Sequence, residues 1–209
     1  MKDYIKNPMD IENRSFEIIE SEMNSHNFTN EELNVVKRVI HTTADFDYEN
    51  IIHFSDDAIV KAQEILSKGI TVYTDTNMAL SGINKIALRK LNCDGKCYVS
   101  DNNVKSIAKE KNITRSMAGV EIAVNEGVEF FVFGNAPTAI YKLLELVDKG
   151  ISKPKFIIGV PVGFVGAEES KKLLETYNIP MITIRGRKGG SPVAASIMNA
   201  IMYLMIKRQ

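Results

Sequence analysis

The 209-residue sequence lacks an excess of charge of either sign, since 26 Lys and Arg residues face 26 Asp and Glu residues and the formal net charge is zero. This balance excludes a generally basic nucleic-acid binder and an acidic disordered tail. The sequence also lacks an apolar run approaching the roughly 20 residues of a membrane span, and its first residues carry no apolar stretch of signal-peptide length. We therefore expect a cytoplasmic protein that binds neither nucleic acid nor membranes.

Cysteine and histidine are also scarce. Cys93 and Cys97 are four positions apart, which is not the Cys-x-x-Cys redox spacing. A four-ligand zinc site needs two further ligands, and the only histidines are His26, His41 and His53. We expect reduced, structural thiols and no metal site. His26 lies in a polar connector and is expected to be solvated, whereas His53 is expected to be structural.

Five short apolar runs, rich in β-branched and aromatic residues, alternate with helical patterns. Near-continuous runs of this kind are typical of strands buried on both faces of a parallel sheet. The predicted strands are residues 70–74, 97–100, 128–133, 156–160 and 181–184. Apolar residues recur every three or four positions in the segments between and after them, for example in residues 58–66, 139–147 and 197–204. The alternation predicts a three-layer α/β/α fold with a largely parallel, five-stranded sheet.

The first 50 residues differ from the rest, because they carry two helical patterns and no convincing strand. These patterns cover residues 10–23 and 30–40, and Asn30 is the expected N-cap of the second. We find no linker rich in Pro, Gly or Ser and no internal repeat. We therefore predict one domain over residues 1–209, with an N-terminal helical arm.

Ligands of such sheets bind beyond the carboxyl ends of the strands. Three of the turns expected there are rich in small residues and open helices, and helix N-termini with accessible N–H groups bind anions. The last turn adds Arg185, Arg187 and Lys188, which suit carboxylate or phosphate. One such turn is compatible with a purely structural role, but three at one edge favour a ligand. The usual phosphate-loop and dinucleotide fingerprints are absent from the sequence.

Two further residues have placements that suggest chemistry. His41 directly follows the predicted helix 30–40, and the carbonyl end of a helix favours the charged imidazolium. That suits a proton donor, and it equally suits a histidine that only caps the helix. Arg115 is expected at the start of a helix, where a cation is unfavourable unless an anion binds. A solvated surface arginine is the alternative.

Several motifs, in this order along nearly the whole chain, are similar to those of the precorrin-8X methylmutase family, which includes the cobalt-precorrin-8 methylmutases. They are IENRSF at residues 11–16, RVIHTTAD at 38–45, TRS at 114–116, GNAPTA at 134–139, GVPVGFVGAEESK at 159–171 and RGRKGGS at 185–191. The longest of these motifs is highly specific, and no departure occurs at the positions that matter.

The resemblance implies an isomerase of cobalamin biosynthesis, which moves a methyl group from C-11 to C-12 of a ring-contracted tetrapyrrole without a redox cofactor or S-adenosylmethionine. It places the catalytic histidine at His41 and substrate-binding positions at Ser15, Arg38 and Arg115. Nothing in the bare helical pattern singles out Ser15 or Arg38. The resemblance also implies a homodimer with the pigment bound close to the subunit interface.

The residues agree with this chemistry. A histidine that titrates near neutrality is able to donate a proton to the ring and take it back. The acetate and propionate arms of the pigment need discrete cations in a protein without net charge, and Arg38, Arg115, Arg185, Arg187 and Lys188 supply them. Two alternatives remain open: a non-catalytic module that binds a tetrapyrrole or nucleotide, and a nucleotide-dependent α/β enzyme that lacks the common fingerprints.

Overall fold

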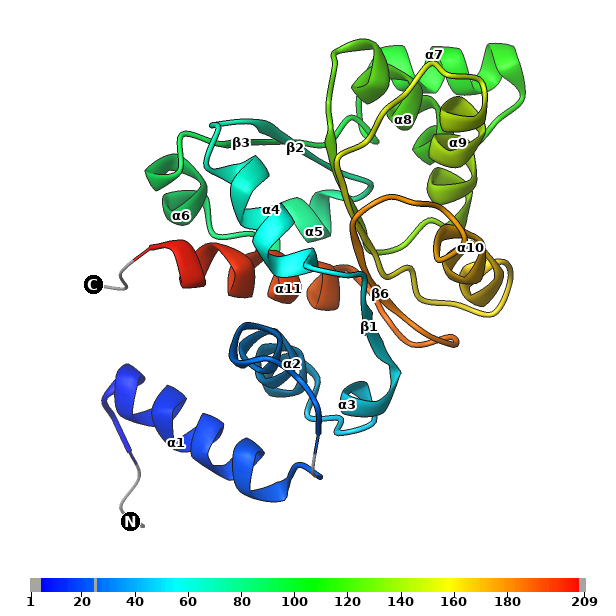
Figure 1. The fold of residues 1–209 in the computed structure, drawn as a ribbon. Coiled ribbons are helices and arrows are strands. Elements are labelled where there is room, and N and C mark those ends of the chain that lie inside the picture. The colour runs from blue at the N-terminus through cyan, green and yellow to red at the C-terminus, as the bar shows by residue number, and fades with distance from the viewer. Residues whose placement is uncertain (1–4, 25, 207–209) are drawn as a thin grey trace.

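The computed structural model describes residues 5–24 and 26–206, which form an α/β structure around one sheet (Figure 1). Six strands pair in the order β1-β6-β5-β4-β2-β3, and all pairings are parallel except that of β1 with β6. The strands are β1 (Ile52–Phe54), β2 (Thr71–Thr74), β3 (Asp94–Lys96), β4 (Phe130–Phe133), β5 (Phe156–Gly159) and β6 (Met181–Ile184). The predicted α/β fold with a largely parallel sheet is confirmed, but the predicted strand count of five is wrong.

The differences lie at the two edges of the sheet. The antiparallel edge strand β1 was not predicted, because three residues with one polar member carry little signal. At the other edge, β3 is Asp94–Lys96, and the predicted strand at residues 97–100 is instead an irregular segment that ends in a turn. The apolar character of that segment has another cause: the Tyr98 ring stacks on Tyr73, with ring centroids 5.9 Å apart.

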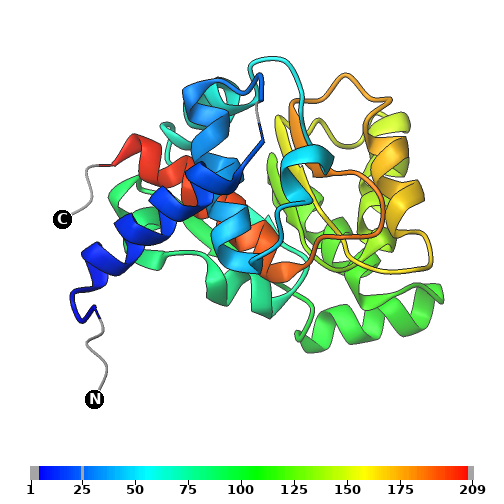
Figure 2. The same ribbon diagram turned by 90° about the horizontal axis from the view of Figure 1, so that it is seen from below.

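Helices cover both faces of the sheet, which gives the three predicted layers (Figures 1 and 2). The helices are α1 (Pro8–Glu22), α2 (Asn30–Thr43), α3 (Tyr48–Ile51), α4 (Ala58–Leu66), α5 (Asn77–Gly82), α6 (Lys85–Lys90), α7 (Asn102–Lys111), α8 (Arg115–Asn125), α9 (Pro137–Asp148), α10 (Ala167–Leu174) and α11 (Ser191–Met205). Among the described residues, no helix has the length and apolar character needed to cross a membrane.

The core lies on both faces of the central strands. In β4, Phe130 and Val132 join the apolar cluster formed with α2, α4 and α11, whereas Phe131 and Phe133 join the cluster formed with α8, α9 and α10. All four side chains are fully buried. Burial on both faces explains why this strand was visible in the sequence as a continuous apolar run.

The two predicted N-terminal helices are present, and α1 packs on the outer side of α2 (Figures 1 and 2). The predicted cap of α2 was wrong by one residue. Thr29 is the N-cap, and it forms a reciprocal capping box with Glu32, so Asn30 is the first helical residue. At the other end α2 continues past residue 40 to Thr43, and Ala44 follows in the left-handed region with φ 52°.

Candidate functional site

The end of α2 meets the carboxyl edge of the parallel strands. Residues 44–51 lead from α2 into β1, and Ile51 accepts a backbone hydrogen bond of 2.7 Å from Arg185 N, directly after β6. The segment 185–190 is bonded in turn to the segment after β5. Gly163 N donates to Arg187 O at 3.1 Å, and Gly190 N donates to Val160 O at 2.8 Å. Three connections therefore converge at this edge, where ligands of such sheets bind.

His41 lies in the last turn of α2, not beyond the helix as predicted, and its side chain is exposed. Its ring contacts the ring of Phe16 from α1, with centroids 5.4 Å apart and planes tilted by 43°. The Phe16 ring therefore packs against one part of the imidazole, and the rest of the side chain is exposed to the solvent.

Arg38 lies one turn before His41 and touches the same ring. Its guanidinium is 4.9 Å from the Phe16 centroid and 5.1 Å from that of Tyr203, and it donates a 2.7 Å hydrogen bond to Glu12. Arg38 therefore joins α1, α2 and α11 in this structure. Ser15, on α1, is half-buried and donates its hydroxyl to Ile11 O at 2.8 Å.

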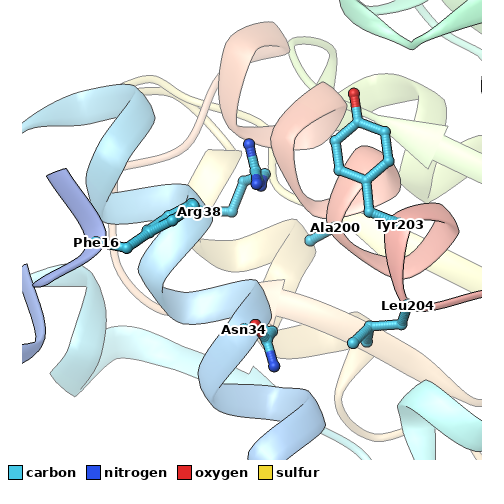
Figure 3. Close-up of a pocket in the computed structure, with 6 residues that line it drawn as sticks. All are labelled: Phe16, Asn34, Arg38, Ala200, Tyr203 and Leu204. Carbon is cyan, nitrogen blue, oxygen red and sulfur yellow. The ribbon is translucent and has the colours of Figure 1, made fainter. Parts of the chain in front are cut away.

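A pocket of about 200 Å³ opens between α2 and α11 beside this guanidinium (Figure 3). Its lining residues are Phe16, Asn34, Arg38, Ala200, Tyr203 and Leu204. Ligand pockets of drug-sized molecules typically measure about 300–1,000 Å³. The pocket is therefore large enough for one side arm of a tetrapyrrole and too small for the whole macrocycle.

Two of the three cations predicted in the segment 185–190 have carboxylate partners. Lys188 Nζ lies 2.5 Å from an Asp45 oxygen and 2.8 Å from an Asp47 oxygen, and these carboxylates raise the pKa of Lys188. Arg185 pairs with Glu175 at 3.2 Å and donates to His53 Nδ1 at the same distance. Lys188 thus links the segment to the connection after α2, and Arg185 links it to β1 and the end of α10. Both cations are less available for a ligand than predicted.

Arg187 differs from both neighbours, because it pairs with no carboxylate in the described part of the chain. Its guanidinium lies 5.5 Å from the Phe164 ring centroid, and the arginine is exposed. Phe164 is 83% exposed and Val165 is 91% exposed, so both present apolar surface to the solvent beside a free cation. A ligand with an apolar ring and carboxylate arms matches that combination.

Arg115 is the first residue of α8, which belongs to the helical layer on the face of the sheet opposite to α2. The residue is exposed, and within the described ranges its guanidinium has no hydrogen-bond or ion-pair partner. The preceding residue, Thr114, caps the helix and lies 3.1 Å from the hydroxyl of Thr138 in the first turn of α9. The unpaired guanidinium therefore lies near two helix N-termini, which is where an anion is favoured.

Asp75, which follows β2 directly, is a buried carboxylate that no sequence motif marked. The side chain is fully buried and accepts hydrogen bonds of 2.9, 2.9 and 2.7 Å from the backbone N–H groups of Gly134, Asn135 and Ala136. Burial raises the pKa of Asp75, while the three donors oppose that shift. Asp75 therefore fixes the connection between β4 and α9. Its position after an apolar run was the available signal.

We expect Asp75→Asn to lower the free energy of unfolding by about 2 kcal/mol, because the amide NH₂ group would face backbone donors and leave at least one unsatisfied. Urea unfolding of the variant and the wild type measures this difference. Asp56→Asn, which changes an exposed carboxylate in the same way, is the control. Equal stability of all three proteins would contradict the role assigned to Asp75.

Neither cysteine takes part in a disulfide in the structure. Cys93 is buried and donates its thiol to Leu66 O at 3.2 Å, which fits the predicted structural role. No group of three or more His, Cys, Asp or Glu side chains within residues 5–24 and 26–206 is arranged to hold a metal ion.

Comparisons with known proteins give one consistent result. Residues 10–204 match the family model of precorrin-8X methylmutase. The chain is 46% identical to the cobalt-precorrin-8 methylmutase of Salmonella typhimurium, over 96% of this chain and 97% of the relative. It is 36% identical to the precorrin-8X methylmutase of Pseudomonas aeruginosa, over 96% and 98%. A crystal structure of the Thermus thermophilus precorrin-8X methylmutase matches with a TM-score of 0.87 and 33% identity, over 94% of this chain and 95% of that chain.

Proposed function

The chain belongs to the precorrin-8X methylmutase family, and we propose that it is an isomerase of cobalamin biosynthesis. The reaction moves a methyl group from C-11 to C-12 of precorrin-8X or cobalt-precorrin-8 and gives hydrogenobyrinate or cobyrinate. We further propose that residues 1–209 form one methylmutase domain, that it acts in the cytoplasm without a cofactor, and that it works as a homodimer. Phe164 and Val165 are large apolar side chains exposed to the solvent, which supports the proposal that the substrate or a second copy of the chain covers them.

The observation that carries the proposal is the exposed imidazole of His41, held against Phe16 at the edge where the ligand-binding loops converge. Substrate and product are isomers, so the enzyme only needs to lower the barrier to a rearrangement. His41 donates a proton to the conjugated ring, which becomes electron-poor. The bond from C-11 to the methyl group then breaks as the bond to C-12 forms, and the proton returns to His41.

The remaining site residues bind the substrate. We assign carboxylate contacts first to Arg115 and Arg187, because neither has a carboxylate partner in the described chain. Arg38 and Ser15 contact the pigment beside His41. Arg185 and Lys188 form the base of the site, since their charges are already shared with Glu175, Asp45 and Asp47.

Incubation of the purified protein with each pigment, followed by visible spectroscopy, tests the proposal. We expect the spectrum of at least one pigment to change to that of the corrin product, and the pigment that reacts faster identifies the natural route. Binding without a spectral change to the product would favour the alternative, a non-catalytic tetrapyrrole-binding module.

We expect Arg115→Ala to weaken pigment binding about 10- to 100-fold, because the loss of a hydrogen bond to a charged group costs about 1.5–3 kcal/mol. A fluorescence or absorbance titration measures the affinity. Arg89→Ala on α6, which also removes an exposed arginine, is the matched control and should bind like the wild type. If Arg115→Ala binds the pigment with the wild-type affinity, Arg115 is a solvated surface residue and does not contact the substrate.

A further inference from the structure

A buried lysine lies behind the segment 185–190 and is not used by the mechanism above. Lys171 on α10 is only 1% exposed, whereas its neighbour Lys172 is exposed and pairs with Glu168 at 2.7 Å. The buried side of α10 is formed by Ala167, Ser170 and Leu174, and Lys171 lies on that side. Removing an ammonium group from water is costly, so its presence here calls for an explanation.

The partner of Lys171 is a backbone carbonyl. Lys171 Nζ donates to Lys188 O at 2.7 Å, and within the described chain the ammonium has no carboxylate within ion-pair distance. A neutral donor would satisfy one carbonyl oxygen at a lower desolvation cost. The hydrogen bond alone therefore does not account for a charged side chain at this position.

The hydrogen bond from Lys171 fixes the segment 185–190, whose side chains make contacts with two different parts of the molecule. The side chain of Lys188 reaches Asp45 and Asp47, just after the end of α2 that carries His41. The side chain of the preceding residue, Arg187, lies exposed over Phe164. The hydrogen bond to Lys188 O consequently fixes the backbone next to Arg187, the cation available to a ligand. It also fixes the residue whose side chain pairs with Asp45, just after α2.

We propose that Lys171 is a positioning residue of the methylmutase site: its buried ammonium fixes the segment 185–190 and adds a titratable positive charge behind Arg187, where a polycarboxylate substrate binds. The inference rests on the proposed function. A charge in the protein interior is screened less than one in water, so it contributes to substrate binding without touching the substrate.

The charge is present in the physiological range and is lost just above it. Burial lowers the pKa of Lys171 to about 8, and nearby Glu168 partly opposes this shift. The ionisable groups on the surrounding elements keep their charge state near pH 8: the pKa of Glu168 is lowered by Lys172, that of Tyr141 on α9 is raised by burial, and that of Lys188 is raised by Asp45. The charged fraction of Lys171 therefore falls as the pH rises through about 8.

The test compares the pH dependence of kcat and KM in the wild type, Lys171→Met and the matched control Lys172→Met between pH 6.5 and 9.5. For the wild type we expect KM to rise as pH increases through about 8, with a smaller effect on kcat. Lys171→Met should have a KM roughly tenfold higher at pH 7 and no such pH dependence. Lys172→Met should follow the wild type.

A wild-type KM that is flat across pH 8, or a Lys171→Met variant with the wild-type KM and profile, would overturn the inference about Lys171. The wild-type profile decides the matter even if Lys171→Met fails to fold. If instead the wild type shows no isomerisation of either pigment, the proposed function itself fails, so the two failures are distinguishable.

Discussion

His41→Asn is expected to lower turnover roughly 10²- to 10⁴-fold, which is the usual contribution of a positioned general acid. Asparagine keeps a polar side chain beside Phe16 at the end of α2, but it carries no proton that it can donate to the ring at neutral pH. Pigment binding should largely survive, because the free cations Arg115 and Arg187 lie outside α2. Single-turnover rates and pigment titrations on the same protein separate the two effects.

His26→Asn is the matched control, because His26 is also exposed and also contacts an aromatic ring, that of Phe28. It should bind and isomerise the pigment like the wild type. If His41→Asn isomerises the pigment at the wild-type rate, His41 is only a residue in the last turn of a helix, and the proton donor has been assigned wrongly.

Gly189→Ala is expected to lower the free energy of unfolding by about 3 kcal/mol and to weaken pigment binding as well. A Cβ at this position would lie 2.2 Å from Val160 O and 3.0 Å from Pro161 O, and both atoms belong to the backbone. The φ angle of +147° adds strain for any L side chain. The segment that carries Arg187 would have to move away from the β5–α10 connection.

Gly186→Ala is the control for that variant, since it lies in the same segment with φ +74° and nothing within 4 Å of the added carbon. Gly186→Ala should lower the free energy of unfolding by only about 1–2 kcal/mol, the usual penalty for an L residue in the left-handed region. Urea unfolding and pigment titration measure both variants. If the two variants lose stability and pigment affinity to the same extent, close backbone packing at residue 189 does not position the segment that carries Arg187.

The central strands were predictable because they are buried on both faces, and the edges were not. The run at residues 128–133 identified β4, of which Phe131 is a fully buried member. β3 is the polar sequence Asp94–Lys96 with a single neighbour in the sheet, so no apolar pattern marks it. The apolar residues that follow β3 include Tyr98, which lies outside any strand and stacks its ring on Tyr73 of β2.

The residue types of the candidate site were also predictable, but their pairing was not. The charges of Arg185, Arg187 and Lys188 are equivalent in the sequence, and only the fold brings Glu175 and Asp45 to two of them. Likewise, no periodicity distinguishes buried Lys171 from its exposed neighbour, because the inward face of a helix depends on what packs against it. Such contacts join residues that are far apart in the sequence.

The position of the migrating methyl group after reaction tests the proposed isomerisation most directly. Pigment labelled with ¹³C in the methyl group on C-11 is incubated with the wild-type protein, and the product is examined by ¹³C NMR and mass spectrometry. The proposed isomerase predicts an unchanged mass and a label that has moved to C-12. A label that remains on C-11, in pigment that the protein binds, would contradict the account.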